Sequence, residues 1–452
     1  MSRLTAALLF AALPLFGQDP FTTAVDSAAT DILKKTGAPS ASIAVVRDGK
    51  LVYTHAYGLA NLETKTPANP QMRYSIGSIS KQFTATAVLM LAEEGKLSLD
   101  DKVVRWLPEL TRSNDVTIRQ LLSMTSGYQD FWPQDYVMPP MLQPVTAREI
   151  MDQWGRKGLD FDPGTRWQYS NTNYVIAGQI VERVAAMPLL AFLQQRVFGP
   201  LQMTSVADTD SGPLGPNDAA RYLRYALGPP RPAPKEGKGW MFAAGELAMT
   251  AADLAKWDIS MIEQRLMKPE SYRALQTEIR LKDGAGTSYG LGVNVALIGG
   301  RRLISHGGEV SGFTATNQVY PDDRVAIVVQ TNLDATGASS QIATKIADLI
   351  FTPPGGKELE QAKTIFAGLQ KGRIDRSLFT ANANAYLNET ALRDFAASLA
   401  PLGTPTEFTQ TRESLRGGMT LRNYRVVFPK KTLRAWTFTM PDGKLEQLMV
   451  AE

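Results

Sequence analysis

Strand signals occur at two widely separated places in this chain, and a long middle without regular strand alternation lies between them. Near the start, apolar runs at 42–46 and 51–53 flank the Asp48-Gly49 turn and predict a β-hairpin. Further strands are predicted much later, at 289–297, 302–305, 314–320 and 325–330. This order predicts an α+β fold in which one antiparallel sheet is assembled from both ends of the segment.

Helical patterns surround these strands. Helices are predicted at 21–36, 80–94 and 340–351, and the middle of the chain has the pattern of helices joined by Pro- and Gly-rich loops. We therefore expect an antiparallel sheet flanked by helices in one domain over 21–352, with an inserted all-helical domain at about 95–250. A cleft where the sheet and the insertion meet is the expected ligand site.

A small α+β module over 357–452 is expected after the Pro353-Pro354-Gly355-Gly356 break. Trp436, Phe438 and Met440 alternate with threonines, which predicts an antiparallel hairpin with one buried face, and helices are predicted at 358–371 and 383–399. No motif in this module points to chemistry, so we expect a packing or oligomerisation role. A sharper hypothesis is that it limits the size of substrates that reach the cleft.

The N-terminus has the pattern of a secretory signal peptide over residues 1–18. Arg3 supplies a short positive region, Leu4 to Phe16 are largely apolar, and small Gly17 precedes polar residues. Pro14 argues against the alternative of a core helix. We expect export, with a periplasmic or secreted mature protein, and no later apolar run is long enough to span a bilayer.

Charge and composition exclude several classes of function. The chain has 48 Lys plus Arg against 44 Asp plus Glu, and the basic residues are scattered rather than clustered, which argues against nucleic-acid binding. It has no cysteine and two histidines, His55 and His306, so zinc chemistry is not expected, while a carboxylate site for a hard cation stays open. No cofactor is expected, and the expected partner is a small-molecule or peptide substrate.

Ser78 and Lys81 form the only Ser-x-x-Lys in the chain and stand where the helix ending near Glu94 begins. Residues three apart share a helix face. A lysine held beside a serine, desolvated, is able to take the hydroxyl proton, and the helix N-terminus supplies N–H donors for an oxyanion. The alternative for this pattern alone is a capping serine beside a solvated lysine.

Tyr169 and Asn171 form a Tyr-x-Asn after the turn Pro163-Gly164-Thr165. A tyrosine near a lysine cation is expected to ionise more readily and to act as general base to a serine and acid to a leaving group. The alternative is a half-buried structural aromatic. Tyr386-Leu387-Asn388 matches the same pattern inside a predicted regular helix of the C-terminal module.

A third motif, His306-Gly307-Gly308, follows the predicted strand at 302–305 and precedes Glu309. Two glycines permit a ligand to approach the backbone closely. A backbone N–H just after them is a candidate partner for that of Ser78 in an oxyanion hole. His55 lies on a predicted strand with no motif around it, and we interpret it as structural.

Taken in this order, the three motifs resemble those of the penicillin-recognising serine hydrolases, in particular the class C β-lactamase-like branch that includes D-alanyl-D-alanine carboxypeptidases, esterases and D-aminopeptidases. The segments 74–84 and 243–257 are also similar to this family, and the likeness covers roughly 26–351. The resemblance implies the β-lactamase/transpeptidase-like fold. Tyr386 lies outside the order and is discarded.

The resemblance also implies residue roles. Ser78 forms an acyl-enzyme, Lys81 and Tyr169 move protons, and Asn171 contacts both the substrate and the lysine. His306, with Gly308, Glu309 and the neighbouring backbone, lines the opposite wall and contacts the substrate.

Two departures from the family pattern affect the expected substrate. Met124 stands in a loop where the family often has histidine. More importantly, His306 replaces the lysine of true β-lactamases, and imidazole is mostly neutral near pH 7. This favours esters, amides or small D-amino-acid peptides over anionic β-lactams. The competing hypothesis is a noncatalytic sensor of cell-wall fragments or β-lactams that keeps the fold.

Overall fold

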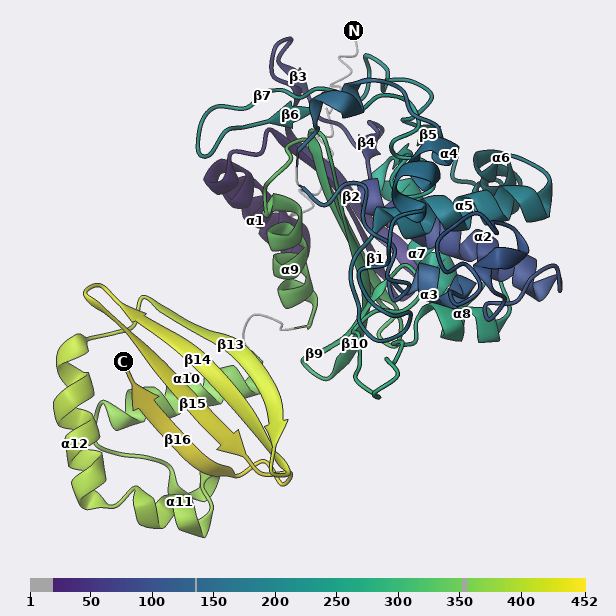
Figure 1. Cartoon of the computed structure of the whole chain (residues 1–452). Coiled ribbons are helices and arrows are strands. Elements are labelled where there is room, and N and C mark those ends of the chain that lie inside the picture. Colours follow the sequence, from purple (N-terminus) through teal and green to yellow (C-terminus); the bar gives the residue numbers. More distant parts are fainter. Residues whose placement is uncertain (1–18, 135, 352–355) are drawn as a thin grey trace, which may run out of the picture.

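The computed structural model describes residues 19–134, 136–351 and 356–452, so the predicted signal peptide lies outside the described residues (Figure 1). Its main sheet has seven strands in the order β3-β2-β1-β12-β11-β10-β9. The strands are β1 (Ser40–Arg47), β2 (Lys50–Asn61), β3 (Thr66–Pro67), β9 (Asn294–Ile298), β10 (Arg301–Val310), β11 (Phe313–Tyr320) and β12 (Val325–Thr331). The early hairpin pairs with the late strands through β1 and β12, with Ala41 opposite Thr331. The antiparallel sheet built from both ends is thus confirmed.

Both faces of this sheet are covered, which explains the continuous apolar run of β1. Ile43 on one face packs with α1 (Pro20–Thr36) and α9 (Ala338–Phe351). Ala44 and Val46 on the other face belong to a larger core that includes α2 (Lys81–Glu93), α5 (Asn171–Ala185) and α7 (Ala251–Glu263). Figure 1 shows α1 and α9 on the side of the sheet away from the helical insertion.

The insertion is mostly helical and also contains very short strands. Within about 95–250 its helices, besides α5, are α3 (Ile118–Leu122), α4 (Ala147–Ile150) and α6 (Leu189–Leu193), while α2 precedes this range and α7 and α8 (Pro269–Leu275) follow it. Its short strands are β5 (Ala207–Asp208), β6 (Tyr222–Leu223), β7 (Arg231–Pro232) and β8 (Leu247–Met249), and a further short strand, β4 (Tyr74–Ser75), precedes it. They form a three-stranded sheet, β4-β8-β5, and the pair β6-β7.

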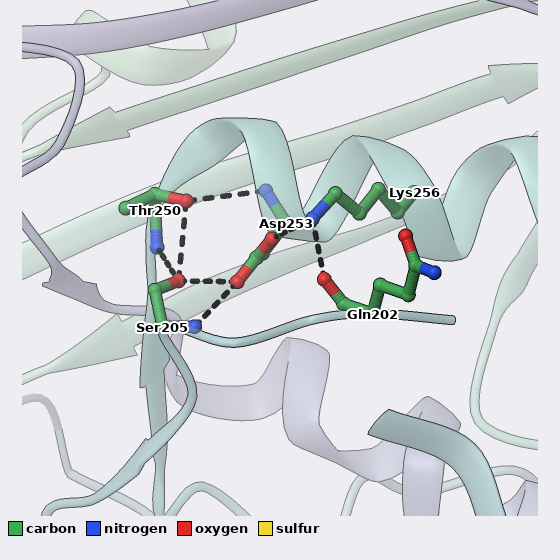
Figure 2. Close-up of polar contacts among 5 residues, drawn as sticks. All are labelled: Gln202, Ser205, Thr250, Asp253 and Lys256. Carbon is green, nitrogen blue, oxygen red and sulfur yellow. Dashed lines mark hydrogen bonds and ion pairs between the residues drawn. The ribbon is translucent and has the colours of Figure 1, made fainter. Parts of the chain in front are cut away.

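A buried carboxylate ties the start of α7 to a preceding loop (Figure 2). The Asp253 carboxylate accepts hydrogen bonds from the Ser205 amide (2.7 Å) and hydroxyl (2.6 Å) and from Lys256 Nζ (2.7 Å). Thr250 caps the helix by accepting from the Asp253 amide. The segment 251–257, similar to the family in sequence, therefore has a structural role at this point.

The C-terminal module has its own core. It comprises α10 (Lys357–Leu369), α11 (Ala381–Tyr386), α12 (Glu389–Leu399) and a sheet β13-β14-β15-β16, whose strands are β13 (Glu407–Arg416), β14 (Met419–Phe428), β15 (Lys431–Thr439) and β16 (Leu445–Ala451). Helical and sheet residues of this module form one hydrophobic cluster, which includes Leu369, Leu399 and Val426.

Two details of the module differ from prediction. The predicted helix 383–399 is two helices, because Asn388 caps a new one by accepting from the Ala391 amide. The strand alternation of β15 is correct, but the buried positions are Leu433, Ala435 and Thr437 rather than the aromatic ones. A period of two indicates that a strand has two faces, and only the packing of the helices decides which of them is covered.

Within the described ranges, no single helix is long and apolar enough to cross a membrane, although one sharply bent pair, Asn171–Ala185 with Leu189–Phe198, meets the length and composition test.

Candidate active site

Ser78 lies in a 3₁₀ turn, Gly77–Ser80, that leads directly into α2, rather than within the α-helix itself. Side chains three residues apart eclipse each other in a 3₁₀ turn. Lys81, the first residue of α2, therefore reaches back, and its Nζ lies 2.8 Å from Ser78 Oγ. Ser78 is partly exposed and lines a cleft, whereas Lys81 is fully buried.

Lys81 Nζ has three hydrogen-bond partners. Besides Ser78 Oγ they are Asn171 Oδ1 at 2.8 Å and the Ala244 carbonyl at 2.9 Å. Burial lowers the pKa of the Lys81 ammonium to about 7, against the opposing effect of the Asp130 charge. Because this pKa lies near neutrality, the neutral amine form of this lysine is accessible at pH 7.

Asp130 is a site residue that the sequence motifs did not reveal. Its Oδ1 accepts hydrogen bonds from the backbone N–H of Asn171 at 2.9 Å and from the backbone N–H of Trp132 at 3.2 Å. Asn171 Nδ2 lies 3.2 and 3.3 Å from its two carboxylate oxygens. Asp130 follows the Met124 loop and stands in no recognised pattern, so only spatial proximity identifies it.

Tyr169 lies on the cleft wall beside Ser78. Its ring centroid is 4.9 Å from Lys81 Nζ, and its hydroxyl interacts with the Ser78 side chain. The expectation that this tyrosine ionises readily is wrong, because burial raises the pKa of its hydroxyl well above the ordinary value despite the contact with Ser78. Tyr169 is therefore protonated at neutral pH.

His306 is buried on the opposite side of the cleft, inside β10 rather than after its end. Residues 306–309 stay in the ladder with β11, where His306 pairs with Asn317 and Gly308 with Ala315. The imidazole Nε2 is 2.9 Å from the Tyr289 hydroxyl. Tyr289 is thus, like Asp130, a residue near the site that no sequence motif predicted. Burial, assisted by the charge of Lys81, lowers the pKa of His306 to about 4, so the ring is neutral at pH 7.

Strand β10 packs closely against the 3₁₀ turn Gly77–Ser80, and this approach requires glycine. A Cβ on Gly308 would lie 1.9 Å from the Ile76 carbonyl oxygen, and one on Gly77 would lie 2.8 Å from the Glu309 backbone nitrogen. Gly77 also has φ +49°, in the left-handed region. The backbone after the two glycines thus lies beside Ser78, while the oxyanion hole stays a prediction.

The cleft has a volume of about 1150 Å³ and contains the predicted residues Ser78, Tyr169, Asn171, His306, Gly308 and Glu309. Among the described residues that line it, none is lysine or arginine. Glu309 Oε1 accepts from the Ala335 amide at 2.7 Å. His55 is instead exposed on β2 against the Tyr57 ring, and Tyr386 is exposed at the end of α11.

Within the described part of the chain, no group of three or more His, Cys, Asp and Glu side chains is arranged to hold a metal ion.

Comparison with known proteins identifies several relatives. A family described as Beta-lactamase matches residues 25–350. A D-aminopeptidase from Brucella anthropi is 28% identical over 341 residues, which are 72% of this chain and 61% of the relative. One from Brucella canis is 27% identical over 328 residues, which are 71% and 61% of the two chains. The chain thus spans about three-fifths of the length of these relatives.

Solved structures with the same fold include a D-stereospecific amidohydrolase from Streptomyces, with 26% identity, a TM-score of 0.64, and coverage of 74% of this chain and 99% of that one. The octameric penicillin-binding protein homologue from Pyrococcus abyssi has 20% identity and a TM-score of 0.64, covering 95% and 100%. The second likeness, of fold alone, extends into the C-terminal module. With its family match and with its three motifs gathered around one cleft, the chain belongs to the beta-lactamase family of penicillin-recognising serine hydrolases.

Proposed function

We propose that this protein is a serine hydrolase that acts through an acyl-enzyme on Ser78. The observation that carries the proposal is the set of three contacts around Lys81 Nζ. Asn171 Oδ1 and the Ala244 carbonyl are acceptors, so they take the two N–H groups of a neutral amine. The remaining lone pair then faces the Ser78 hydroxyl at 2.8 Å.

In this mechanism Lys81 accepts the Ser78 proton while Oγ attacks the substrate carbonyl carbon. The tetrahedral intermediate collapses as its leaving amine or alkoxide receives a proton. Tyr169, protonated and in contact with Ser78, is placed to donate that proton and is recharged from the Lys81 ammonium. Water then attacks the acyl carbonyl by the same proton transfers in reverse order, which releases the acid and restores Ser78.

We propose amides or small peptides of D-amino acids, with a free amino group, as the preferred substrates. The acidic residues Glu309 and Asp334 lie on the cleft wall, and carboxylates there favour a ligand that carries a positive charge. His306 is neutral and offers no fixed positive charge to a penicillin carboxylate. The similarity to D-aminopeptidases and to a D-stereospecific amidohydrolase supports the same class.

The test compares three substrates on one preparation: a D-alanine nitroanilide, a short-chain nitrophenyl ester and a chromogenic cephalosporin. We expect kcat/KM to be lowest for the cephalosporin. Replacement of Ser78 by alanine is expected to reduce turnover of the first two by at least about 10³-fold, with the thermal unfolding midpoint unchanged. Turnover near wild type in this variant, or a wild-type protein that binds ligands without turnover, would contradict the proposal and favour a noncatalytic sensor.

We also propose that residues 1–18 are removed during export. The charged, apolar and small-residue order of this segment supports cleavage near Gly17. N-terminal sequencing of the protein recovered from the periplasm or medium should begin close to Asp19. Recovery of an intact Met1 terminus from the cytoplasm would contradict export.

A further inference from the structure

We propose that Asp130 is a positioning residue for this hydrolase, which holds the Asn171 amide with its oxygen toward Lys81 and so directs the lysine lone pair at Ser78. The inference rests on the function proposed above. It assigns a role to a residue outside the three motifs, and three steps support it.

The first step concerns the amide of Asn171, whose two ends are similar in shape but opposite in hydrogen bonding. Its oxygen accepts, and its nitrogen only donates. With Oδ1 toward Lys81, the neutral amine of Lys81 donates an N–H to this oxygen at 2.8 Å, and its lone pair stays free for Ser78. With Nδ2 toward Lys81, the amide would donate to the lone pair and take it away from Ser78. Catalysis by Lys81 therefore requires one of the two orientations.

The second step concerns what selects that orientation. Asn171 Nδ2 lies 3.2 and 3.3 Å from the two Asp130 oxygens, and an ionised carboxylate only accepts hydrogen bonds. Asp130 Oδ1 is itself held by the Asn171 and Trp132 backbone amides, at 2.9 and 3.2 Å. A flipped amide would bring its oxygen against this carboxylate. Asp130 thus excludes the unproductive orientation.

The third step concerns charge. Asp130 is the charged group that opposes the lowering of the Lys81 pKa by burial, and Lys81 in turn opposes the raising of the Asp130 pKa. The other groups near the lysine, which are Tyr169, Tyr174 and His306, are neutral at pH 7 because of burial. Loss of the Asp130 charge would therefore leave desolvation unopposed and lower the Lys81 pKa further.

The test is the pH profile of Asp130→Asn, which keeps the size of the side chain and removes its charge. We expect kcat on the D-alanine nitroanilide to fall about tenfold or more, with KM changed much less. We also expect the acidic limb of kcat/KM to move to lower pH by roughly 1 pH unit. Asp130→Glu, which keeps the charge, should leave that limb in place. Asp130→Ser gives the same test as Asp130→Asn if the latter does not fold.

Two further variants separate this role from a general one. Asp100→Asn removes an exposed carboxylate that pairs with Arg119 and does not line the cleft, and the acidic limb of its kcat/KM profile should stay at the wild-type pH. Asn171→Ala should lower kcat, and adding Asp130→Asn to it should cost little more kcat, because Asp130 acts through Asn171.

Three results would overturn the positioning role. The first is that the kcat losses of Asp130→Asn and Asn171→Ala multiply in the double variant. The others are an acidic limb of kcat/KM that stays in place in Asp130→Asn, or an effect of this variant on KM alone. Each of these outcomes leaves the hydrolase function standing as long as the wild-type protein turns over and Ser78→Ala does not. A wild-type protein without turnover would instead overturn the proposed function itself.

Discussion

At the scale of single residues, the fully buried Lys81 sets the expected pH dependence. In the proposed mechanism its neutral amine is the active form, and burial lowers its pKa to about 7. Activity should therefore be lost as pH falls through about 7 and should reach a plateau above it. His306, with a pKa of about 4, stays neutral over this range and adds no second limb. A profile of kcat/KM from pH 5 to 9 measures this acidic loss of activity and its apparent pKa.

Replacing Lys81 by arginine should abolish turnover, by about 10³-fold or more, because a guanidinium does not lose its proton in this range. The matched control is Lys96→Arg, at an exposed lysine paired with Glu94, which should keep the wild-type profile. A plateau that continues to pH 5, or an active Lys81→Arg variant, would show that another group takes the serine proton.

Residue types with a fixed spacing were the part of the site that the sequence could predict. Ser78, Lys81, Tyr169, Asn171 and His306 are drawn from three separate segments, and they line or border one cleft. Asp130 and Tyr289 were not predicted from the sequence, because a single carboxylate or phenol outside any motif has no spacing to identify it. The protonation state of Tyr169 was also not predicted, because the burial that raises its pKa depends on packing that the local sequence does not specify.

At the scale of elements, the approach of β10 to the turn Gly77–Ser80 depends on Gly308 more than on Gly307. A Cβ at Gly308 would lie 1.9 Å from the Ile76 oxygen, whereas one at Gly307 would meet nothing closer than the Ala315 oxygen at 3.9 Å. Gly308→Ala should push the strand away from Ser78 and lower kcat/KM by about 10²-fold. Gly307→Ala should stay within a few-fold of wild type.

Kinetics and thermal unfolding of both glycine variants check this contrast. Equal losses in the two variants would mean that chain flexibility, and not the close contact with Ile76, explains the requirement for glycine. The predicted strand at 302–305 was too short for a related reason. Glycine usually weakens a strand, so the strand was predicted to end before Gly307. Gly307 and Gly308 nevertheless continue the ladder with β11, and Gly308 lies so close to the Ile76 backbone that a side chain would not fit there.

At the scale of the whole molecule, the chain has cores that do not mix. Among the described residues, the clusters that hold the main sheet draw on residues between Val25 and Ala347. The C-terminal cluster draws on residues between Ala362 and Leu448. The order of strand and helix signals was sufficient to predict this sheet, because each strand's apolar run is local. Which face of the C-terminal sheet is covered depends on distant helices, so it was not predicted.

A chain ending at Phe351 should therefore fold by itself, because a domain with its own core is able to do so. We expect it to hydrolyse the D-alanine nitroanilide with a kcat/KM within about threefold of the full chain, since no residue assigned to chemistry lies beyond 351. If the C-terminal module limits substrate size, the truncated chain should gain rate only on longer D-amino-acid peptides. Equal ratios of long- to short-substrate kcat/KM in the two proteins would leave the module a packing or oligomerisation role. Loss of activity on the small substrate, in a truncated protein whose circular dichroism is native, would instead mean that the module supplies part of the site.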